Sequence, residues 1–324
     1  MKKVLITTVP FGGINPMPFR LLEEAGVNFE INPLGKKLTE NELADMVTDY
    51  DAIIAGTEPI TDKVMSKASK LNLISRVGIG LDSVDLTAAR NRNILVSYTP
   101  DAPSKAVSDL TIGFMLSLLR GVHVANLKMH KGEWGRVLGR RLGEVTVGLI
   151  GVGRIGTGVL GRLQGFGCKR IIVNDIEPKH HLETAFGLEW VDKNTIYKEA
   201  DVISLHVPLT KETKNLIGRS ELQMMRPDAL LINTARGGII SENDLYEILK
   251  EGHLGGAAID VFEQEPYSGP LCEIEKCLLT SHMGSMSIDC RIRMEIEATE
   301  EVVRFAKGQV LRGLVPEEEY EARL

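Results

Sequence analysis

Short runs of β-branched and aliphatic residues recur along the chain, and segments with helical periodicity separate them. Such runs are typical of buried strands, and strands that alternate with helices favour a parallel sheet. The pattern therefore predicts an α/β chain with two parallel sheets, the second one larger. A first series of predicted strands covers 3–6, 51–54, 72–75 and 93–96, and a second covers 145–150, 170–173, 201–205, 229–232 and 257–260.

Two further segments carry a helical pattern. Apolar residues of the segment 101–130 recur at steps of three and four, which predicts one long connecting helix. After Ser287 the apolar residues again follow a helical spacing. The chain then reaches the acidic run 317–319, which we interpret as a solvated, charged end.

Length and charge exclude several classes of protein. A chain of 324 residues favours two domains, and its 43% hydrophobic and 25% charged residues are ordinary for a soluble globular protein. The 44 acidic and 38 basic residues give a net charge of −6, which provides no attraction to phosphate backbones or anionic lipid. We therefore expect no nucleic acid and no membrane as partners.

Membrane spans, targeting segments and metal sites are not expected either. The longest apolar stretch, 110–119, is about half of the roughly twenty residues that a span requires. Pro10, Gly12 and Gly13 interrupt any signal-peptide core, so the N-terminus is predicted to be a first strand. The four cysteines lack the spacing of a zinc or redox site. Reduced thiols therefore predict a cytoplasmic protein without a bound metal.

A glycine-rich turn follows the first strand of the second series. Gly151, Gly153 and Gly156 satisfy G-x-G-x-x-G directly after Ile150, where they permit a tight turn, a close approach of pyrophosphate and helix packing. Asp175 closes the next predicted strand, where its carboxylate would bind the ribose hydroxyls and repel a 2′-phosphate. This context predicts NAD rather than NADP. S-adenosylmethionine enzymes use a similar turn and stay open as an alternative at this point.

Three polar residues of the second half lie just beyond predicted strands. Arg236 follows the strand 229–232, Glu265 follows the strand 257–260, and His282 lies a short distance further on. Ligands of such sheets bind at the carboxyl edge. An arginine can hold a carboxylate bidentately, and a histidine paired with a glutamate suits proton donation near neutral pH. Each residue taken alone is more often structural, and the position beyond a strand end favours catalysis only modestly.

Motifs spread over most of the chain resemble one family. The sequence resembles the D-isomer-specific 2-hydroxyacid dehydrogenases, and it is most similar to the short-form D-3-phosphoglycerate dehydrogenases. The matching segments occur in the family's order. They are 76–85, 147–156, 206–210, 232–238, 260–266 and 282–284.

The resemblance implies a role for each catalytic candidate. Arg236 would orient the substrate carboxylate and keto oxygen, His282 would be the acid/base, and Glu265 would pair with His282 and raise its pKa. Hydride would pass between the nicotinamide and C2 of the substrate. The backbone amides of Ile79 and Gly80 match the loop that holds the substrate carboxylate, so substrate binding is predicted at these two residues together with Arg236 and His282.

The cofactor site follows from the same resemblance. Arg154 and Ile155 would place backbone N–H groups on the pyrophosphate, and His206 would be a wall of the cofactor pocket rather than a proton carrier. Trp134 is interpreted as core or dimer packing. The positions that match NAD contacts are Gly151, Gly153, Arg154, Ile155, Gly156, Asp175, His206, Pro208, Thr234, Ala235, Arg236, Asp260, His282 and Gly284.

Together these observations predict two Rossmann-like, doubly wound parallel-sheet domains, of which the smaller is flavodoxin-like and discontinuous. Residues 1–98 and 287–324 would form the substrate-binding domain, and residues 99–286 the NAD-binding domain. A homodimer is expected through the cofactor domain and its helix from Asp101. Since 324 residues leave no length for the regulatory domain of longer family members, we expect no feedback inhibition through one.

The predicted reaction interconverts a D-2-hydroxy acid and its 2-keto acid. The substrate pair could be 3-phosphoglycerate and 3-phosphohydroxypyruvate, although segment 55–59 has no arginine where some phosphoglycerate enzymes hold the phosphate. Other small 2-keto acids such as hydroxypyruvate or glyoxylate are the alternative substrates. An NAD(H)-sensing protein, similar to the corepressors of this superfamily, is an alternative of another class.

Overall fold

The structure is a computed structural model that describes residues 2–321. The chain divides into two compact units, one formed by Met1–Pro103 and Ser285–Leu324 and the other by Ser104–Gly284. The predicted domain limits fall beside these positions. The first boundary lies within the first turn of helix α5 (Ala102–Arg120), and the second lies just before helix α12 (Ile288–Ala306).

The first unit contains a five-stranded parallel sheet in the order β2-β1-β3-β4-β5. This order is that of flavodoxin-like folds and confirms the predicted class. Helices α2, α3 and α4 supply apolar residues to the core on one face, whereas α12 packs against β3 and β4 and also against α1. The strands are β1 (Lys3–Ile6), β2 (Asn28–Ile31), β3 (Ala52–Ala55), β4 (Leu73–Arg76) and β5 (Leu95–Ser97); the helices besides α12 are α1 (Met17–Glu24), α2 (Glu40–Met46), α3 (Asp62–Lys67), α4 (Leu86–Asn91) and α13 (Glu317–Glu321).

The second unit contains a seven-stranded parallel sheet in the order β12-β11-β10-β9-β6-β7-β8. In chain order this is 3-2-1-4-5-6 with one further strand, the doubly wound order of dinucleotide-binding folds. The strands are β6 (Thr146–Ile150), β7 (Arg170–Asn174), β8 (Leu188–Trp190), β9 (Val202–Leu205), β10 (Leu230–Asn233), β11 (Gly256–Ile259) and β12 (Cys277–Leu279).

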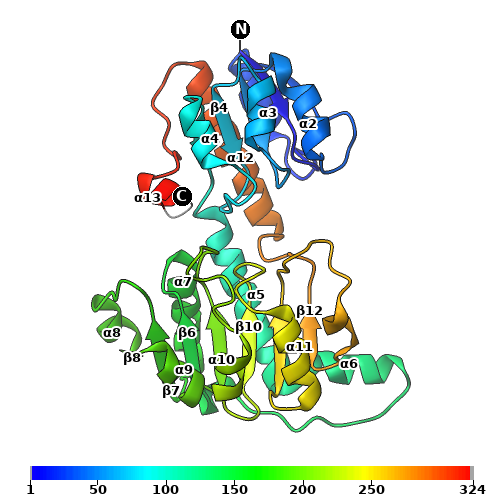
Figure 1. Cartoon of the computed structure of the whole chain (residues 1–324), viewed down its shortest axis with the longest axis vertical. Coiled ribbons are helices and arrows are strands. Elements are labelled where there is room, and N and C mark those ends of the chain that lie inside the picture. The colour runs from blue at the N-terminus through cyan, green and yellow to red at the C-terminus, as the bar shows by residue number, and fades with distance from the viewer. Residues whose placement is uncertain (1, 322–324) are drawn as a thin grey trace. The chain divides into compact units, whose positions relative to one another are not determined.

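Two hydrophobic clusters cover the two faces of this larger sheet. Helices α9, α10 and α11 contribute to one cluster, and α5 and α7 contribute to the other (Figure 1). Because both faces are covered, the central strands are fully buried and read as continuous apolar runs. The helices besides α5 are α6 (Val122–His130), α7 (Arg154–Leu163), α8 (His181–Phe186), α9 (Lys193–Glu199), α10 (Arg219–Met224) and α11 (Glu242–Glu251).

The prediction of one continuous helix over 101–130 is wrong. Gly121 adopts a left-handed conformation with φ of 59°, and the helix breaks there into α5 and α6, which are bent by 67°. No single helix among residues 2–321 is long and apolar enough to cross a membrane, although the bent α5–α6 pair meets the requirements of length and composition. Met115 and Leu118 of α5 belong to the core of the second unit.

The interpretation of a charged, solvated end agrees with the structure, whereas that of Trp134 as core packing does not. The acidic run 317–319 begins helix α13, in which Glu317 and Glu318 are exposed. Glu317 pairs with Arg90 at the surface, and the Tyr320 ring lies 4.4 Å from the same guanidinium. Trp134 is 82% exposed, so it does not belong to the core. It lies in the extended segment 131–141 that follows α6, which Figure 1 shows reaching away from the rest of its unit.

Candidate functional site

The glycine-rich turn has the geometry of a dinucleotide-binding turn. Gly151 has φ of +98°, and a Cβ at this position would lie 2.4 Å from the carbonyl oxygen of His206. A Cβ on Gly156 would lie 2.2 Å from the Gly151 carbonyl oxygen, so helix α7 starts close against the turn. A Cβ on Gly153, in contrast, would meet nothing within 4 Å. The turn therefore leaves open space at the N-terminus of α7, where Arg154 and Ile155 follow.

Asp175 lies directly beside this turn. Its carboxylate accepts hydrogen bonds from the backbone N–H of Val152 at 2.6 Å and from that of Glu177 at 3.2 Å. The ammonium of Lys179 donates to the carbonyl oxygen of Val152 at 3.0 Å. The Asp175 side chain thus connects the ends of β6 and β7, and its binding of a ribose stays a prediction.

His206 follows β9 and forms part of the wall behind the turn. Its Nε2 lies 2.9 Å from the hydroxyl oxygen of Ser204, and its buried Nδ1 has no hydrogen-bond partner among residues 2–321. Burial lowers the pKa of His206 to about 4. The imidazole is therefore neutral at pH 7 and unsuited to proton donation.

The loop after β10 contains Arg236, and hydrogen bonds of the Asn233 side chain stabilise it. The Asn233 side chain donates to the carbonyl oxygen of Arg236 at 2.8 Å and accepts from the backbone N–H of Ala235 at 3.0 Å. The Thr234 hydroxyl lies 3.1 Å from that of Thr111 on helix α5. Sequence reasoning assigned no role to Asn233, although asparagine side chains often hydrogen-bond to nearby backbone groups in turns.

Glu265 and His282 form a direct pair. Nδ1 of His282 lies 2.9 Å and 3.1 Å from the two carboxylate oxygens of Glu265. The backbone N–H of Phe262 donates to one of these oxygens at 3.1 Å, which orients the carboxylate. His282 itself has φ of 50°, a left-handed conformation that few residues other than glycine adopt. The surrounding loop holds it there.

Asp260 is the residue that holds this loop. Its buried carboxylate accepts from the backbone N–H groups of Met283 at 2.8 Å and Gly284 at 2.9 Å and also from the Thr280 hydroxyl. The backbone N–H of His282 donates to the Asp260 carbonyl oxygen at 2.7 Å. In this structure the Asp260 side chain fixes the shape of segment 280–284, a role that sequence reasoning did not assign to it.

The loops of Arg236 and Glu265 touch each other. A Cβ on Gly237 would lie 2.0 Å from the carbonyl group of Phe262, so only glycine permits this approach. Because β10, β11 and β12 are neighbours in the sheet, Arg236, Glu265 and His282 follow three adjacent strands at the same edge. The structure brings Glu265 and His282 into contact and places Arg236 on the neighbouring loop.

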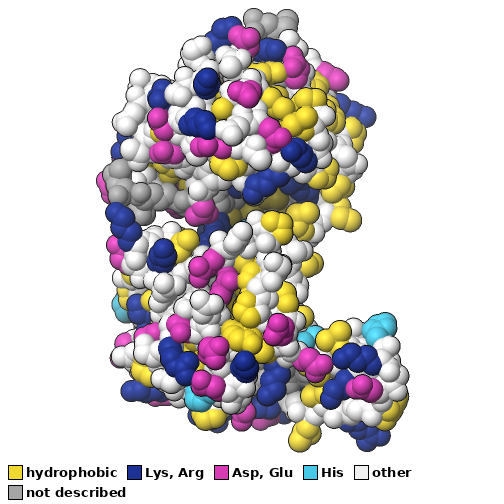
Figure 2. Space-filling model, turned by 45° about the vertical axis from the view of Figure 1, so that its right-hand side comes forward, with side chains coloured by type: hydrophobic (Ala, Val, Ile, Leu, Met, Phe, Trp, Pro, Cys, Tyr) yellow, Lys and Arg dark blue, Asp and Glu magenta, His cyan; other side chains and the backbone are white. Residues whose placement is uncertain are grey.

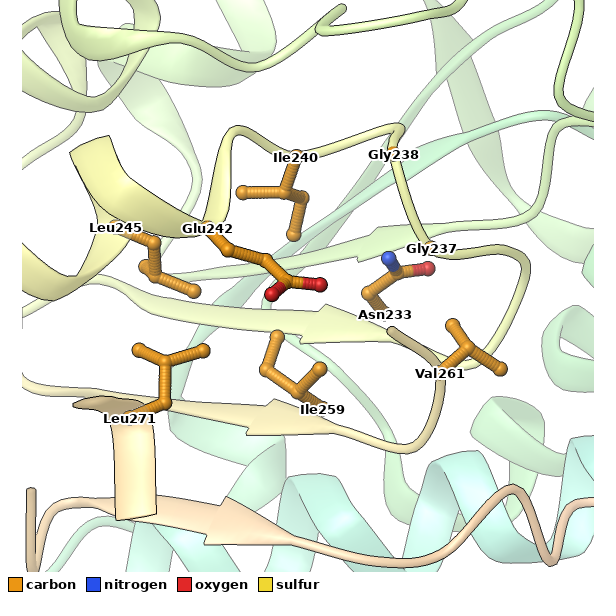
Figure 3. Close-up of a pocket in the computed structure, with 9 residues that line it drawn as sticks. All are labelled: Asn233, Gly237, Gly238, Ile240, Glu242, Leu245, Ile259, Val261 and Leu271. Atoms are coloured by element: carbon orange, nitrogen blue, oxygen red, sulfur yellow. The ribbon is translucent and has the colours of Figure 1, made fainter. Parts of the chain in front are cut away.

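A small pocket lies beneath these two loops (Figure 3). Glu242, the first residue of helix α11, points into it among mostly apolar side chains. Burial raises the pKa of Glu242, the hydrogen bond from the Glu263 N–H opposes this shift, and the nearby carboxylates of Glu263 and Glu265 add to it. The pocket is lined by Asn233, Gly237, Gly238, Ile240, Glu242, Leu245, Ile259, Val261 and Leu271.

In the first unit, the predicted substrate loop follows β4. Gly78 has φ of +134°, its N–H donates to the Thr99 hydroxyl at 2.8 Å, and Ile79 and Gly80 come next. The buried Arg76 guanidinium donates to the carbonyl oxygen of Val77 at 2.8 Å. The loop therefore has a defined shape, and substrate binding by Ile79 and Gly80 stays a prediction.

No group of three or more His, Cys, Asp or Glu side chains among the described residues could hold a metal ion. Cys168, Cys272, Cys277 and Cys290 are all free thiols.

Comparison with known proteins identifies the second unit. Residues 112–284 match the family model of the D-isomer specific 2-hydroxyacid dehydrogenase, NAD binding domain. These residues include the glycine-rich turn, Asp175, Arg236, Glu265 and His282. The S-adenosylmethionine alternative is therefore excluded, and the cofactor of the matched domain is NAD.

Relatives cover nearly the whole chain. A D-3-phosphoglycerate dehydrogenase of Methanocaldococcus jannaschii is 37% identical over 97% of this chain, which spans 59% of that relative's length. A glyoxylate reductase of Thermococcus litoralis is 37% identical over 84% of this chain and 86% of its own. The crystal structure of the TT0316 protein from Thermus thermophilus has a TM-score of 0.89 and 34% identity, and the match covers 97% of this chain and 100% of that one.

Proposed function

This chain belongs to the D-isomer specific 2-hydroxyacid dehydrogenase family, and we propose that it uses NADH to reduce a small, unphosphorylated 2-keto acid to the D-2-hydroxy acid. Family membership makes it an NAD-dependent oxidoreductase for a 2-hydroxy acid and 2-keto acid pair. The contact between Glu265 and His282 beside the Arg236 loop is the observation that carries the assignment of the chemistry. The substrate, the direction and the residue roles are the proposal.

Three side chains have separate roles in the proposed reduction. The Arg236 guanidinium binds the substrate carboxylate and polarises the keto oxygen, because two parallel N–H groups match a carboxylate. His282 donates a proton from Nε2 to the keto oxygen as that oxygen becomes an alkoxide. The Glu265 carboxylate, which contacts Nδ1, stabilises the protonated imidazole and fixes the orientation of the ring.

The second unit offers a fitting site for the cofactor. When bound, NADH supplies the hydride to C2 of the substrate. The open space over Gly153 and the first-turn N–H groups of α7 suit a pyrophosphate, and Asp175 lies where the adenosine ribose would be bound. The buried Nδ1 of His206 has no partner among the described residues, so it offers one further hydrogen-bonding position.

The absence of basic side chains in segment 55–59 carries the substrate proposal. The buried side chain of Glu58 accepts hydrogen bonds from the Gly56 N–H at 2.9 Å and from the Thr7 hydroxyl. Segment 55–59 has no lysine or arginine of its own, and the guanidinium of the neighbouring buried Arg76 donates to the backbone carbonyl oxygens of Ala55 at 3.4 Å and Val77 at 2.8 Å. A lining of this kind, with a carboxyl group at its centre, is unsuited to a dianionic phosphate. The relatives named glyoxylate reductase and hydroxypyruvate reductase agree with an unphosphorylated substrate.

The first experiment measures NADH oxidation with glyoxylate, hydroxypyruvate, pyruvate, 3-phosphohydroxypyruvate and a bulky 2-keto acid, with NADPH in parallel. We expect the highest kcat/KM for glyoxylate or hydroxypyruvate with NADH. A higher kcat/KM for 3-phosphohydroxypyruvate would overturn the substrate proposal and favour the phosphoglycerate reaction. NADH binding without turnover across the panel would instead favour an NAD(H)-sensing protein.

The role of His282 is tested by His282→Ala. We expect kcat to fall by about a hundredfold or more, since general acid catalysis contributes about that much, while the Kd of NADH changes little. His181→Ala is the matched control because it removes an exposed imidazole at the start of helix α8, outside the proposed dimer surface. A kcat of His282→Ala equal to that of the control would show that another group donates the proton.

We also propose that two copies of the chain associate through α6 and the segment 131–141. Figure 2 shows apolar side chains among the basic ones on this projecting part. Trp134 is 82% exposed and Leu138 is fully exposed, and single isolated units rarely present such side chains together on one arm. A second copy with the same arm could cover them in a twofold arrangement. The exposed apolar side chains here are Val122, Leu127, Met129, Trp134, Val137 and Leu138.

The oligomeric state tests this surface directly. Light scattering after gel filtration should give the mass of a homodimer, twice 35.6 kDa, for the native chain. Leu138→Asp should shift the mass toward the monomer, whereas Leu95→Asp, which alters an exposed leucine of the other unit, should not. A native monomer would contradict the proposal.

We propose a cytoplasmic location from the four free cysteines, since disulfides are rare in reducing compartments. Fractionation of source cells with an antibody to the chain tests it, and recovery outside the cytoplasmic fraction would contradict it.

A further inference from the structure

Glu242, at the start of α11, is a half-buried carboxyl group that the proposed reaction does not use. Figure 3 shows its side chain directed into the pocket toward Asn233, with Ile240 and Ile259 close by. A carboxyl group in apolar surroundings is unfavourable unless hydrogen bonds compensate for the lost hydration. One Glu242 oxygen accepts a hydrogen bond from the backbone N–H of Glu263 at 2.6 Å.

This hydrogen bond connects Glu242 to the proton-transfer pair. Glu263 lies in the loop that leads to Glu265, and the preceding N–H of the same loop, that of Phe262, donates to Glu265. Glu265 in turn contacts Nδ1 of His282. The successive N–H groups of Phe262 and Glu263 thus donate to two different carboxyl groups. One of them, Glu265, lies within the loop, and the other, Glu242, lies outside it.

Glu242 also belongs to the chain segment that starts at Arg236. The Arg236 loop runs through Gly237 and Gly238 to Glu242, and Gly237 lies against the Phe262 carbonyl group. A Cβ on Gly238 would lie 3.8 Å from the side chain of Glu263. The Glu242 hydrogen bond is therefore a second link between the loop that carries Arg236 and the loop that carries Glu265.

Capping of helix α11 does not account for this side chain. The Ser241 hydroxyl already accepts from the N–H of Asp244 as the N-cap of the helix. An acidic residue in the first turn is favourable toward the helix dipole, but that effect needs no contact with another loop. The contact with Glu263 points to a role outside the helix.

We propose that Glu242 is a positioning residue that fixes the loop 262–265, so that the Glu265 carboxylate faces His282 while Arg236 stays beside them. The inference rests on the proposed function, in which His282 donates the proton. Glu242 acts through the Glu263 N–H, and it needs an acceptor oxygen rather than a charge.

The test compares Glu242→Ala, Glu242→Gln and the control Glu247→Gln, which removes a carboxylate from the exposed face of the same helix. In Glu242→Ala we expect kcat to fall about tenfold or more, since small displacements of catalytic groups have effects of this order. The Kd of NADH, measured by fluorescence, should stay within about twofold because the pyrophosphate site is unchanged. Glu242→Gln should keep a kcat within about threefold of the native value, because its amide oxygen still accepts the hydrogen bond.

A second measurement is independent of turnover. The imidazole ¹⁵N resonances of His282, assigned with His282→Asn, report on the contact with Glu265. They should move in Glu242→Ala and stay in place in Glu242→Gln and Glu247→Gln. The comparison still tests the inference if Glu242→Ala is less stable, because Glu242→Gln is expected to keep both the fold and the acceptor oxygen.

Two results would overturn the inference. Native kcat and native His282 resonances in Glu242→Ala would show that the loop keeps its place without Glu242. Losses in Glu242→Gln as large as those in Glu242→Ala would show that the charge matters and not the acceptor. Failure of the proposed function is distinct, since the native chain would then reduce no 2-keto acid or His282→Ala would keep its activity.

Discussion

The buried imidazole of His206 should make the stability of the second unit depend on pH. Burial lowers its pKa to about 4, whereas a histidine in an unfolded chain titrates near 6.5. The unfolded state therefore takes up a proton at a higher pH than the folded state. The folded state has the lower pKa, so the full contribution of neutral His206 to the free energy of unfolding is present above pH 6.5. That contribution is lost as the pH falls toward 4, because the unfolded chain is protonated first.

The size of the effect follows from the two pKa values. Between pH 7 and pH 5, proton linkage at this one group reduces the free energy of unfolding by roughly 2 kcal/mol. For a unit of this size that corresponds to about 4–8 °C in Tm. The Ser204 hydroxyl beside Nε2 is neutral, so no nearby anion in that contact offsets the cost of a buried imidazolium.

The assay compares thermal unfolding of the native chain and His206→Asn, both without cofactor, at pH 7 and pH 5. Carboxyl groups titrate alike in both proteins, so the difference between their pH-dependent losses isolates His206. We expect the variant to lose about 2 kcal/mol less than the native chain over this range. His181→Asn, at an exposed position of α8, should behave as the native chain does. Equal losses in the native chain and His206→Asn would refute the reasoning.

Other substitutions test the site. Gly151→Ala should reduce the unfolding free energy by about 1–3 kcal/mol, measured by urea unfolding, because its Cβ would lie 2.4 Å from the His206 carbonyl oxygen at φ of +98°. A Cβ on Gly153 would meet open space, so Gly153→Ala should change Tm little. The Kd of NADH, measured by fluorescence titration, should rise, and an unchanged Kd would place the pyrophosphate elsewhere. Asp175→Asn removes the repulsion of a 2′-phosphate and should raise the NADPH to NADH ratio of kcat/KM about tenfold; a constant ratio would contradict the ribose assignment. Gly237→Ala should lower kcat, since its Cβ would overlap the Phe262 carbonyl group and push the Arg236 and Glu265 loops apart; native steady-state rates would count against that packing.

The central strands were predictable because a strand that is buried on both faces has a continuous run of apolar residues in the sequence. All four residues of β3 are buried, and so are all five of β6. The edge strands β2, β8 and β12 lack a continuous apolar run, and the sequence analysis did not predict them. In β2 three of the four residues are exposed, so its apolar residues do not form a continuous run.

Hydrophobic periodicity could not predict the helix break at Gly121 either. Apolar spacing continues across it, but the left-handed conformation of this one glycine turns the chain by 67° between α5 and α6. A single glycine inside a helical pattern is compatible with either a continuous helix or a helix end. The packing of α5 into the core of the second unit decided between them.

By itself, the sequence predicted which side chains carry the proposed chemistry. Arg236, Glu265, His282 and the glycine-rich turn each stand beside a strand end or within a local motif, and such signals are contained in a few consecutive residues. The tertiary structure alone decided what holds these groups in place. Asn233, Glu242 and Asp260 act through hydrogen bonds to loops that lie elsewhere in the chain or that take their shape only from the folded sheet edge. The direction of a hydrogen bond depends on where backbone groups meet in space, and local residue patterns do not contain that information.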